Sequence, residues 1–209
     1  MDIPLKGIKA VVFDVFGTLV EIRDKRRTYA QLLGFLERSG RTADRSDGAR
    51  IMSTQADLAG SARALGVALT PDDLAKLEVD LAAELASIEC FPDTIPAIES
   101  LKVAGLQVGL CSNLATPYGP PVQRLLPPMD AYAWSYVAGA VKPDPRIYGH
   151  VCEALCVSPR EVLMIGDTLC ADYVGPRAFG MHACHLARSG EGSAKLSIST
   201  LLDVPLLLS

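Results

Sequence analysis

The sequence lacks a long apolar run, an apolar leader and a CxxC pair. No run reaches the roughly 18 apolar residues that a membrane span needs, and the first ten residues contain no apolar core typical of a secretory signal. Because the six cysteines include no CxxC pair, they are more typical of buried cytosolic thiols than of a metal site. We therefore expect a cytoplasmic protein with no membrane partner.

Basic charge is also scarce. Lys and Arg total 20 against 24 Asp and Glu, which gives a formal net charge of −4. The densest basic stretch, Arg23–Arg27, is interrupted by Asp24 and preceded by Glu21, as in a solvated helix start. No basic block is present that could follow a phosphate backbone, so we expect no nucleic-acid partner.

Apolar residues are abundant, at 49% of the chain with a mean hydropathy of +0.25. Short β-branched runs alternate with helical segments, which predicts a doubly wound parallel sheet with a Rossmann-like α/β architecture. Parallel strands buried on both faces account for the high hydropathy. The predicted strands are 8–13, 106–111, 132–137, 161–165 and 182–186, and the predicted helices are 94–103, 122–126, 145–155 and 171–179.

Residues 23–87 have helical patterning and contain no convincing strand. Leucines 74, 77, 81 and 85 form one amphipathic face, which begins after Thr70-Pro71-Asp72-Asp73. We interpret this stretch as an insertion into the α/β fold. The predicted organisation is therefore a core of residues 1–20 and 90–209, interrupted by a helical cap of residues 21–89.

Polar side chains follow four of the predicted strands. Asp14 and Thr18 come after the first strand, Ser112-Asn113 after the second, Lys142 after the third, and Asp167 and Asp172 after the fourth. Singly, each fits an ordinary turn, helix cap or solvated lysine. Because the carboxyl ends of parallel strands share one edge of a sheet, their joint occurrence predicts a catalytic site there.

Four segments in this order resemble the haloacid dehalogenase (HAD) superfamily, with the insertion where its C1-capped members carry their cap. The matching segments are FDVFGTLV (13–20), CSN (111–113), VKPDPRIY (141–148) and IGDTLCAD (165–172). The resemblance implies a hydrolase with a Rossmann-like core, an aspartate nucleophile at Asp14, a small-molecule substrate and usually Mg²⁺.

Each motif residue then has an expected role. Thr18, Ser112 and the backbone around Gly17 would bind the oxygens of the transferred group, Asn113 would orient substrate or nucleophile, and Lys142 would neutralise charge. Three carboxylates near one point repel each other unless a cation lies among them. We therefore expect Mg²⁺ to be held by Asp14, Asp167, Asp172 (through water) and the backbone carbonyl of Val15 or Phe16, of which the resemblance implies Phe16.

Phe16 departs from the phosphatase pattern, in which a second Asp at this position transfers protons. Two enzyme hypotheses follow. The first is a Mg²⁺-dependent phosphohydrolase whose leaving group needs no proton, or whose cap supplies one from Asp24, Lys25 or Tyr29. The second is a 2-haloacid dehalogenase, since halide leaves without a proton, although Asp167 replaces the Ser-Ser-Asn of that branch. A third hypothesis is a catalytically weak ligand-binding protein. Either a monomer or a homodimer is compatible with the sequence.

Overall fold

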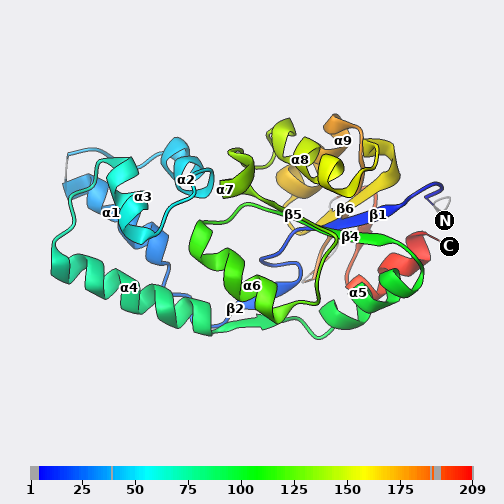
Figure 1. Cartoon of the computed structure of the whole chain (residues 1–209), viewed down its shortest axis with the longest axis horizontal. Coiled ribbons are helices and arrows are strands. Elements are labelled where there is room, and N and C mark those ends of the chain that lie inside the picture. The colour runs from blue at the N-terminus through cyan, green and yellow to red at the C-terminus, as the bar shows by residue number, and fades with distance from the viewer. Residues whose placement is uncertain (1–4, 39, 189, 191–193, 209) are drawn as a thin grey trace.

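A six-stranded, all-parallel sheet forms the centre of the computed structural model, which describes residues 5–38, 40–188, 190 and 194–208 (Figure 1). The strand order is β5-β4-β1-β6-β7-β8, so the chain fills one side of β1 before it crosses to the other. The predicted parallel α/β fold is confirmed. The strands are β1 (Ala10–Phe13), β4 (Gln107–Ser112), β5 (Ala131–Trp134), β6 (Val162–Gly166), β7 (His182–Leu186) and β8 (Ser197–Ile198).

Helices cover both faces of this sheet, as right-handed crossovers require. Residues of β1 alternate between the two faces: Val11 and Phe13 pack toward α5 and α6, while Ala10 and Val12 pack toward α8. All four are fully buried, which explains the continuous apolar run. The helices and single turns of the core are α5 (Thr94–Val103), η1 (Thr116–Tyr118), α6 (Gly119–Leu125), α7 (Ser135–Ala138), α8 (Pro145–Leu155), η2 (Pro159–Glu161), η3 (Leu169–Val174), α9 (Gly175–Phe179) and η4 (Leu201–Leu207).

Four helices lie to one side of the sheet (Figure 1) and supply most of a separate apolar cluster, which Ala115 of the core completes. We call them the helical insert. Thr70 and Asp73 form a reciprocal capping box at the start of the longest helix, where Pro71 is the first residue. The insert consists of α1 (Thr28–Arg38), α2 (Arg45–Met52), α3 (Leu58–Leu65) and α4 (Pro71–Ala86).

The structure corrects several predicted elements. A two-stranded antiparallel ladder of β2 (Val20–Ile22) and β3 (Ile88–Cys90) joins insert to core, and neither strand was predicted. The strand predicted over 132–137 ends at Trp134, because the buried Ser135 hydroxyl receives the Leu114 amide hydrogen there and α7 begins. The helix predicted over 171–179 is a π-helical turn, η3, followed by the short α9.

The structure bears on the lengths of the helices and on the exposure of the cysteines. Every helix of the described residues is too short or too polar to cross a bilayer. The expectation that all the cysteines are buried is wrong: Cys156 and Cys170 are exposed, while Cys111, Cys152 and Cys184 are buried. Parts of the predicted core, residues 1–4, 189, 191–193 and 209, lie outside the described residues.

Candidate active site

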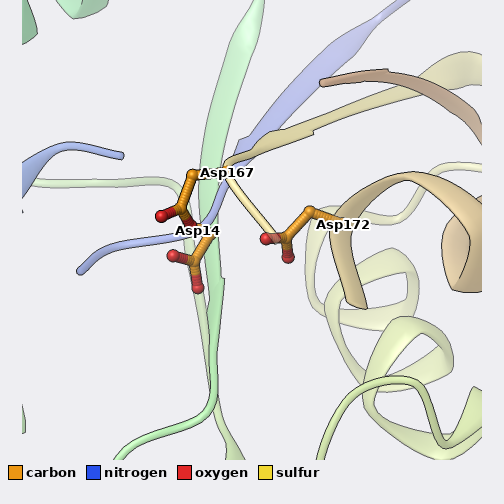
Figure 2. A group of neighbouring side chains, drawn as sticks. All are labelled: Asp14, Asp167 and Asp172. Carbon is orange, nitrogen blue, oxygen red and sulfur yellow. The ribbon is translucent and has the colours of Figure 1, made fainter. Parts of the chain in front are cut away.

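The predicted acidic residues meet at the carboxyl ends of the central strands. Asp14 follows β1, Asp167 follows β6, and Asp172 lies in the turn after it (Figure 2). The strand order reverses at β1, and this reversal opens the edge of a doubly wound sheet to ligands. One carboxylate oxygen from each of the three aspartates lies within 4.8 Å of the others. Asp14 is 153 positions from Asp167 in the chain, so the sheet brings it to the other two aspartates, which are five positions apart.

Lys142 lies between two of these carboxylates. Its Nζ is 2.7 Å from Asp14 Oδ1 and 2.6 Å from Asp172 Oδ1, and all three side chains are buried. Burial alone would lower the pKa of Lys142, but the charges of Asp14 and Asp172 raise it above its ordinary value. The lysine is therefore a fixed positive charge in the site.

Ser112 and Asn113, at the end of β4, position this charge cluster. The Ser112 hydroxyl donates to Asp14 Oδ1 at 3.0 Å. The Asn113 side-chain amide bonds the main chain of Lys142 twice: it receives the Lys142 N–H at 2.7 Å and donates to the Lys142 carbonyl at 3.0 Å. Asn113 thus fixes the backbone that carries the lysine, and its direct contact with a substrate stays a prediction.

Two glycines allow the acidic side chains to approach the backbone. Gly17 has a left-handed φ of +87°, and a Cβ there would lie 2.2 Å from Asp167 Oδ2. A Cβ on Gly166 would lie 2.4 Å from the Asp172 carboxyl group. Any larger residue at either position would displace a carboxylate, so both glycines are needed for the geometry of the site.

The loop after Asp14 is also held by a residue that the sequence did not reveal. Arg188 donates to the Thr18 carbonyl at 2.6 Å and forms a two-pronged pair with Asp93 at 2.9 and 3.0 Å. Thr18 itself is fully buried. The expected contact between its hydroxyl and a substrate stays a prediction. No local motif marks Arg188, because its partners are distant in the chain.

His185 is a second missed neighbour of the site. Its Nε2 lies 2.9 Å from the Asp167 carbonyl oxygen. This contact links β7 to the loop that carries Asp167. A contact to the main chain is compatible with a structural role for this histidine.

The charges of the cluster fit a divalent cation. Three carboxylates and one ammonium group leave two negative charges, and Asp167 is the exposed carboxylate of the three. Burial and the charge of Asp14 raise the pKa of Asp167, and burial raises that of Asp172 to about 6. A cation would remove this electrostatic cost, and hard oxygen donors are the ligands that Mg²⁺ prefers. Asp14, Asp167 and the Phe16 carbonyl would hold it, with Asp172 through water.

Phe16 occupies the position at which the phosphatase pattern has a proton-transferring Asp. Its ring packs edge-on against Tyr118, with centroids 5.6 Å apart and an interplanar angle of 84°. A phenyl ring cannot donate or accept a proton. The position therefore contributes an apolar surface beside Asp14.

A buried aspartate at a strand end, with a lysine, a serine and two further aspartates around it, is an arrangement that a hydrolase with a carboxylate nucleophile could use. The family model for haloacid dehalogenase-like hydrolases matches residues 8–180. The chain therefore belongs to this family of hydrolases.

Individual relatives differ in chemistry. A phosphatase of Mycobacterium tuberculosis is 32% identical, over 88% of this chain and 90% of its own. An (S)-2-haloacid dehalogenase of Burkholderia cepacia is 28% identical, over 88% of this chain and 85% of its own. A HAD phosphatase structure from Thermococcus onnurineus has a TM-score of 0.68 at 24% identity and covers 96% of this chain and 98% of its own, which supports the fold alone.

Proposed function

We propose that the protein is a Mg²⁺-dependent phosphohydrolase with Asp14 as its covalent nucleophile. The observation that carries this proposal is the acidic cluster that keeps two negative charges after pairing with Lys142. A dehalogenase acting on a monoanionic acid has no need of this excess negative charge. A phosphohydrolase uses it to bind the cation that offsets the charge of phosphate.

The contacts of Asp14 suggest how it acts. Its Oδ1 receives hydrogen bonds from Lys142 and Ser112, which leaves Oδ2 to attack the phosphoryl group. Lys142 then offsets charge on the transferred group. The backbone N–H groups of Gly17 and the next two residues do not have the expected role, because they donate to main-chain carbonyls within the loop. Bound Mg²⁺ would supply charge neutralisation at the phosphoryl oxygens. Water hydrolyses the resulting aspartyl phosphate and restores Asp14.

The helical insert fits a cap of the C1 type, and we propose cap bounds of residues 21–89 between the core segments 1–20 and 90–209. The support is its place in the chain, directly after the loop that carries Asp14, and its separate apolar cluster. A cap that closes over the site would exclude water and strengthen the electrostatic contacts within it.

A 2-haloacid dehalogenase is the second candidate, and Phe16 favours it. Halide leaves without a proton, so an aromatic residue suffices at this position. The similarity to the Burkholderia cepacia dehalogenase points the same way. Against it, Asp167 adds a third carboxylate that such chemistry does not use.

One paired assay separates these candidates. Phosphate release is measured on a panel of phosphate esters and acyl phosphates, and chloride release on 2-chloropropionate, each with Mg²⁺ and with EDTA. We expect Mg²⁺-dependent phosphate release that Asp14→Asn abolishes, because an amide oxygen is a far weaker nucleophile. Chloride release that survives EDTA would establish the dehalogenase instead. Calorimetric binding of phosphorylated ligands without any turnover would leave a binding protein.

A further inference from the structure

An apolar pocket of about 320 Å³ lies between the helical insert and the core. Helices α1 and α2 provide Tyr29, Leu33, Ile51 and Met52 on one side, and the core provides Phe16 and Tyr118 on the other. Its volume is at the low end of ligand pockets, which span about 300–1,000 Å³. The pocket is therefore sized for one small group.

None of the residues that line this pocket is charged. The Asn113 amide is engaged with the Lys142 backbone, and the Tyr118 hydroxyl donates to Glu84 at 2.7 Å. The Tyr29 hydroxyl is the polar group of this wall that has no hydrogen-bond partner among the described residues. A carboxylate or a sugar ring placed here would lose water and find no charged partner and too few polar ones, which is costly. An apolar or aromatic group is the chemistry that the pocket accepts.

Two residues of the pocket wall are close neighbours in the chain of residues in the acidic site. Phe16 is two residues beyond Asp14, and Asn113 directly follows Ser112. A substrate whose phosphoryl group lies at Asp14 would thus extend its leaving group over the Phe16 ring. The leaving group, rather than a remote part of the substrate, is what this pocket contacts.

Strongly acidic side chains are absent from the pocket wall, because none of the described residues that line it is Asp, Glu, His or Lys. Of the three donors considered from the sequence, only Tyr29 lines the pocket, and its buried hydroxyl has no hydrogen-bond partner in the part of the chain that the structure describes. A phenol is a weak acid at neutral pH, and burial raises the pKa of Tyr29 further, to about 12. Asp24 is paired with Arg26 on the surface instead. A leaving group that departs as a stable anion therefore fits this wall.

We propose that the substrate is an aromatic acyl phosphate, with its acyl group bound in the apolar pocket. This rests on the proposed phosphohydrolase function. Asp14 Oδ2 forms a bond to phosphorus while the bond from phosphorus to the acyl oxygen breaks. The electron pair leaves with that oxygen as a carboxylate, so no proton is required. Water then cleaves the aspartyl phosphate to inorganic phosphate.

Four phosphates test the two parts of the proposal separately. Acetyl and benzoyl phosphate both release a carboxylate and differ in their apolar group, whereas ethyl and benzyl phosphate release alkoxides. With Mg²⁺, we expect kcat/KM for benzoyl phosphate to be at least tenfold higher than kcat/KM for acetyl phosphate. We also expect it to be at least a hundredfold higher than kcat/KM for benzyl phosphate. Equal rates for benzoyl and acetyl phosphate would overturn the pocket assignment and leave the phosphohydrolase intact. Equal rates for benzoyl and benzyl phosphate would overturn the leaving-group argument.

A variant that fills the pocket tests whether the pocket causes the preference for benzoyl over acetyl phosphate. Gly48 lines the pocket from α2, and a Cβ there would meet no atom within 4 Å. Gly48→Leu fills free space and favours the helix. We expect the preference for benzoyl over acetyl phosphate to fall at least tenfold. Gly34→Leu is the matched control, because Gly34 is also helical and unobstructed but lies outside this pocket, and we expect it to keep the preference. An unchanged preference in Gly48→Leu would contradict the proposal.

A binding experiment gives a result even without turnover. Benzylphosphonate and methylphosphonate carry uncleavable C–P bonds, and calorimetry with Mg²⁺ measures their affinities. We expect at least tenfold tighter binding of benzylphosphonate, and equal affinities would overturn the pocket assignment. If neither phosphonate binds and no phosphate is released from any of the four compounds, the phosphohydrolase function itself fails.

Discussion

The acidic site at the sheet edge and the apolar pocket beneath the insert adjoin each other but are built in opposite ways. In the site, the central charged group has fixed partners: Lys142 binds two aspartates, and Asn113 binds the main chain of Lys142. In the pocket, side chains such as Leu33 and Ile51 offer only contact area. The difference indicates that the core carries the chemistry and the insert carries the selectivity. Variants in the two regions should therefore affect different kinetic constants.

The largest effect is expected from Lys142→Met. It leaves Asp14 and Asp172 buried without their counter-charge, and losing one partner of a buried pair costs about 3–5 kcal/mol. We expect turnover to fall at least 10³-fold and the free energy of unfolding to fall by about that 3–5 kcal/mol, measured by urea denaturation. Lys9→Met is the control, because it removes an exposed pair with Glu161, worth about 0–1 kcal/mol. Equal losses in the two variants would contradict the assigned geometry.

Gly17→Ala should have the next largest effect. The added Cβ would lie 2.2 Å from Asp167 Oδ2 on a residue with left-handed φ, so the loop or the carboxylate must move. We expect at least a hundredfold loss of kcat, since small misplacements at a reacting centre have effects of that order. The measurement is steady-state kinetics on whichever substrate the paired assay identifies.

Gly7→Ala is the control for Gly17→Ala, because it separates the effect of backbone strain from the effect of the close contact with Asp167. Gly7 also has a left-handed φ, +77°, but no atom lies within 4 Å of its would-be Cβ. It should lose about 1–2 kcal/mol of stability with kcat unchanged. If Gly17→Ala behaves in the same way, the close approach of Asp167 to the loop is not important for catalysis.

These residues also show what could be predicted from the sequence. The four strand ends were identifiable because a parallel sheet brings its carboxyl ends to one edge, whatever the loops between them do. The Arg188 contact with Thr18 joins residues 170 positions apart, and no periodicity or local motif encodes it. The ladder of β2 and β3 was not predicted because strands of three residues are too short to show the alternation of apolar and polar residues that marks a strand. The apolar pocket escaped because it forms only where the insert meets the core.

The smallest effect, and the one that tests the link between the two regions, is expected from Tyr118→Phe. Tyr118 in the core donates to buried Glu84 of α4, and Glu84 also accepts from the backbone N–H of Arg27 and Thr28 where α1 begins. The variant keeps the ring that packs on Phe16 but removes the hydrogen bond between insert and core. We expect KM to rise several-fold with kcat nearly unchanged, and stability to fall by about 1–2 kcal/mol. Tyr132→Phe removes a comparable hydrogen bond, from Met129 N–H within the core, and should lower stability without changing KM. If both variants leave KM unchanged, the bond to Glu84 does not hold the insert over the site, and the pocket walls must be held together by apolar packing alone.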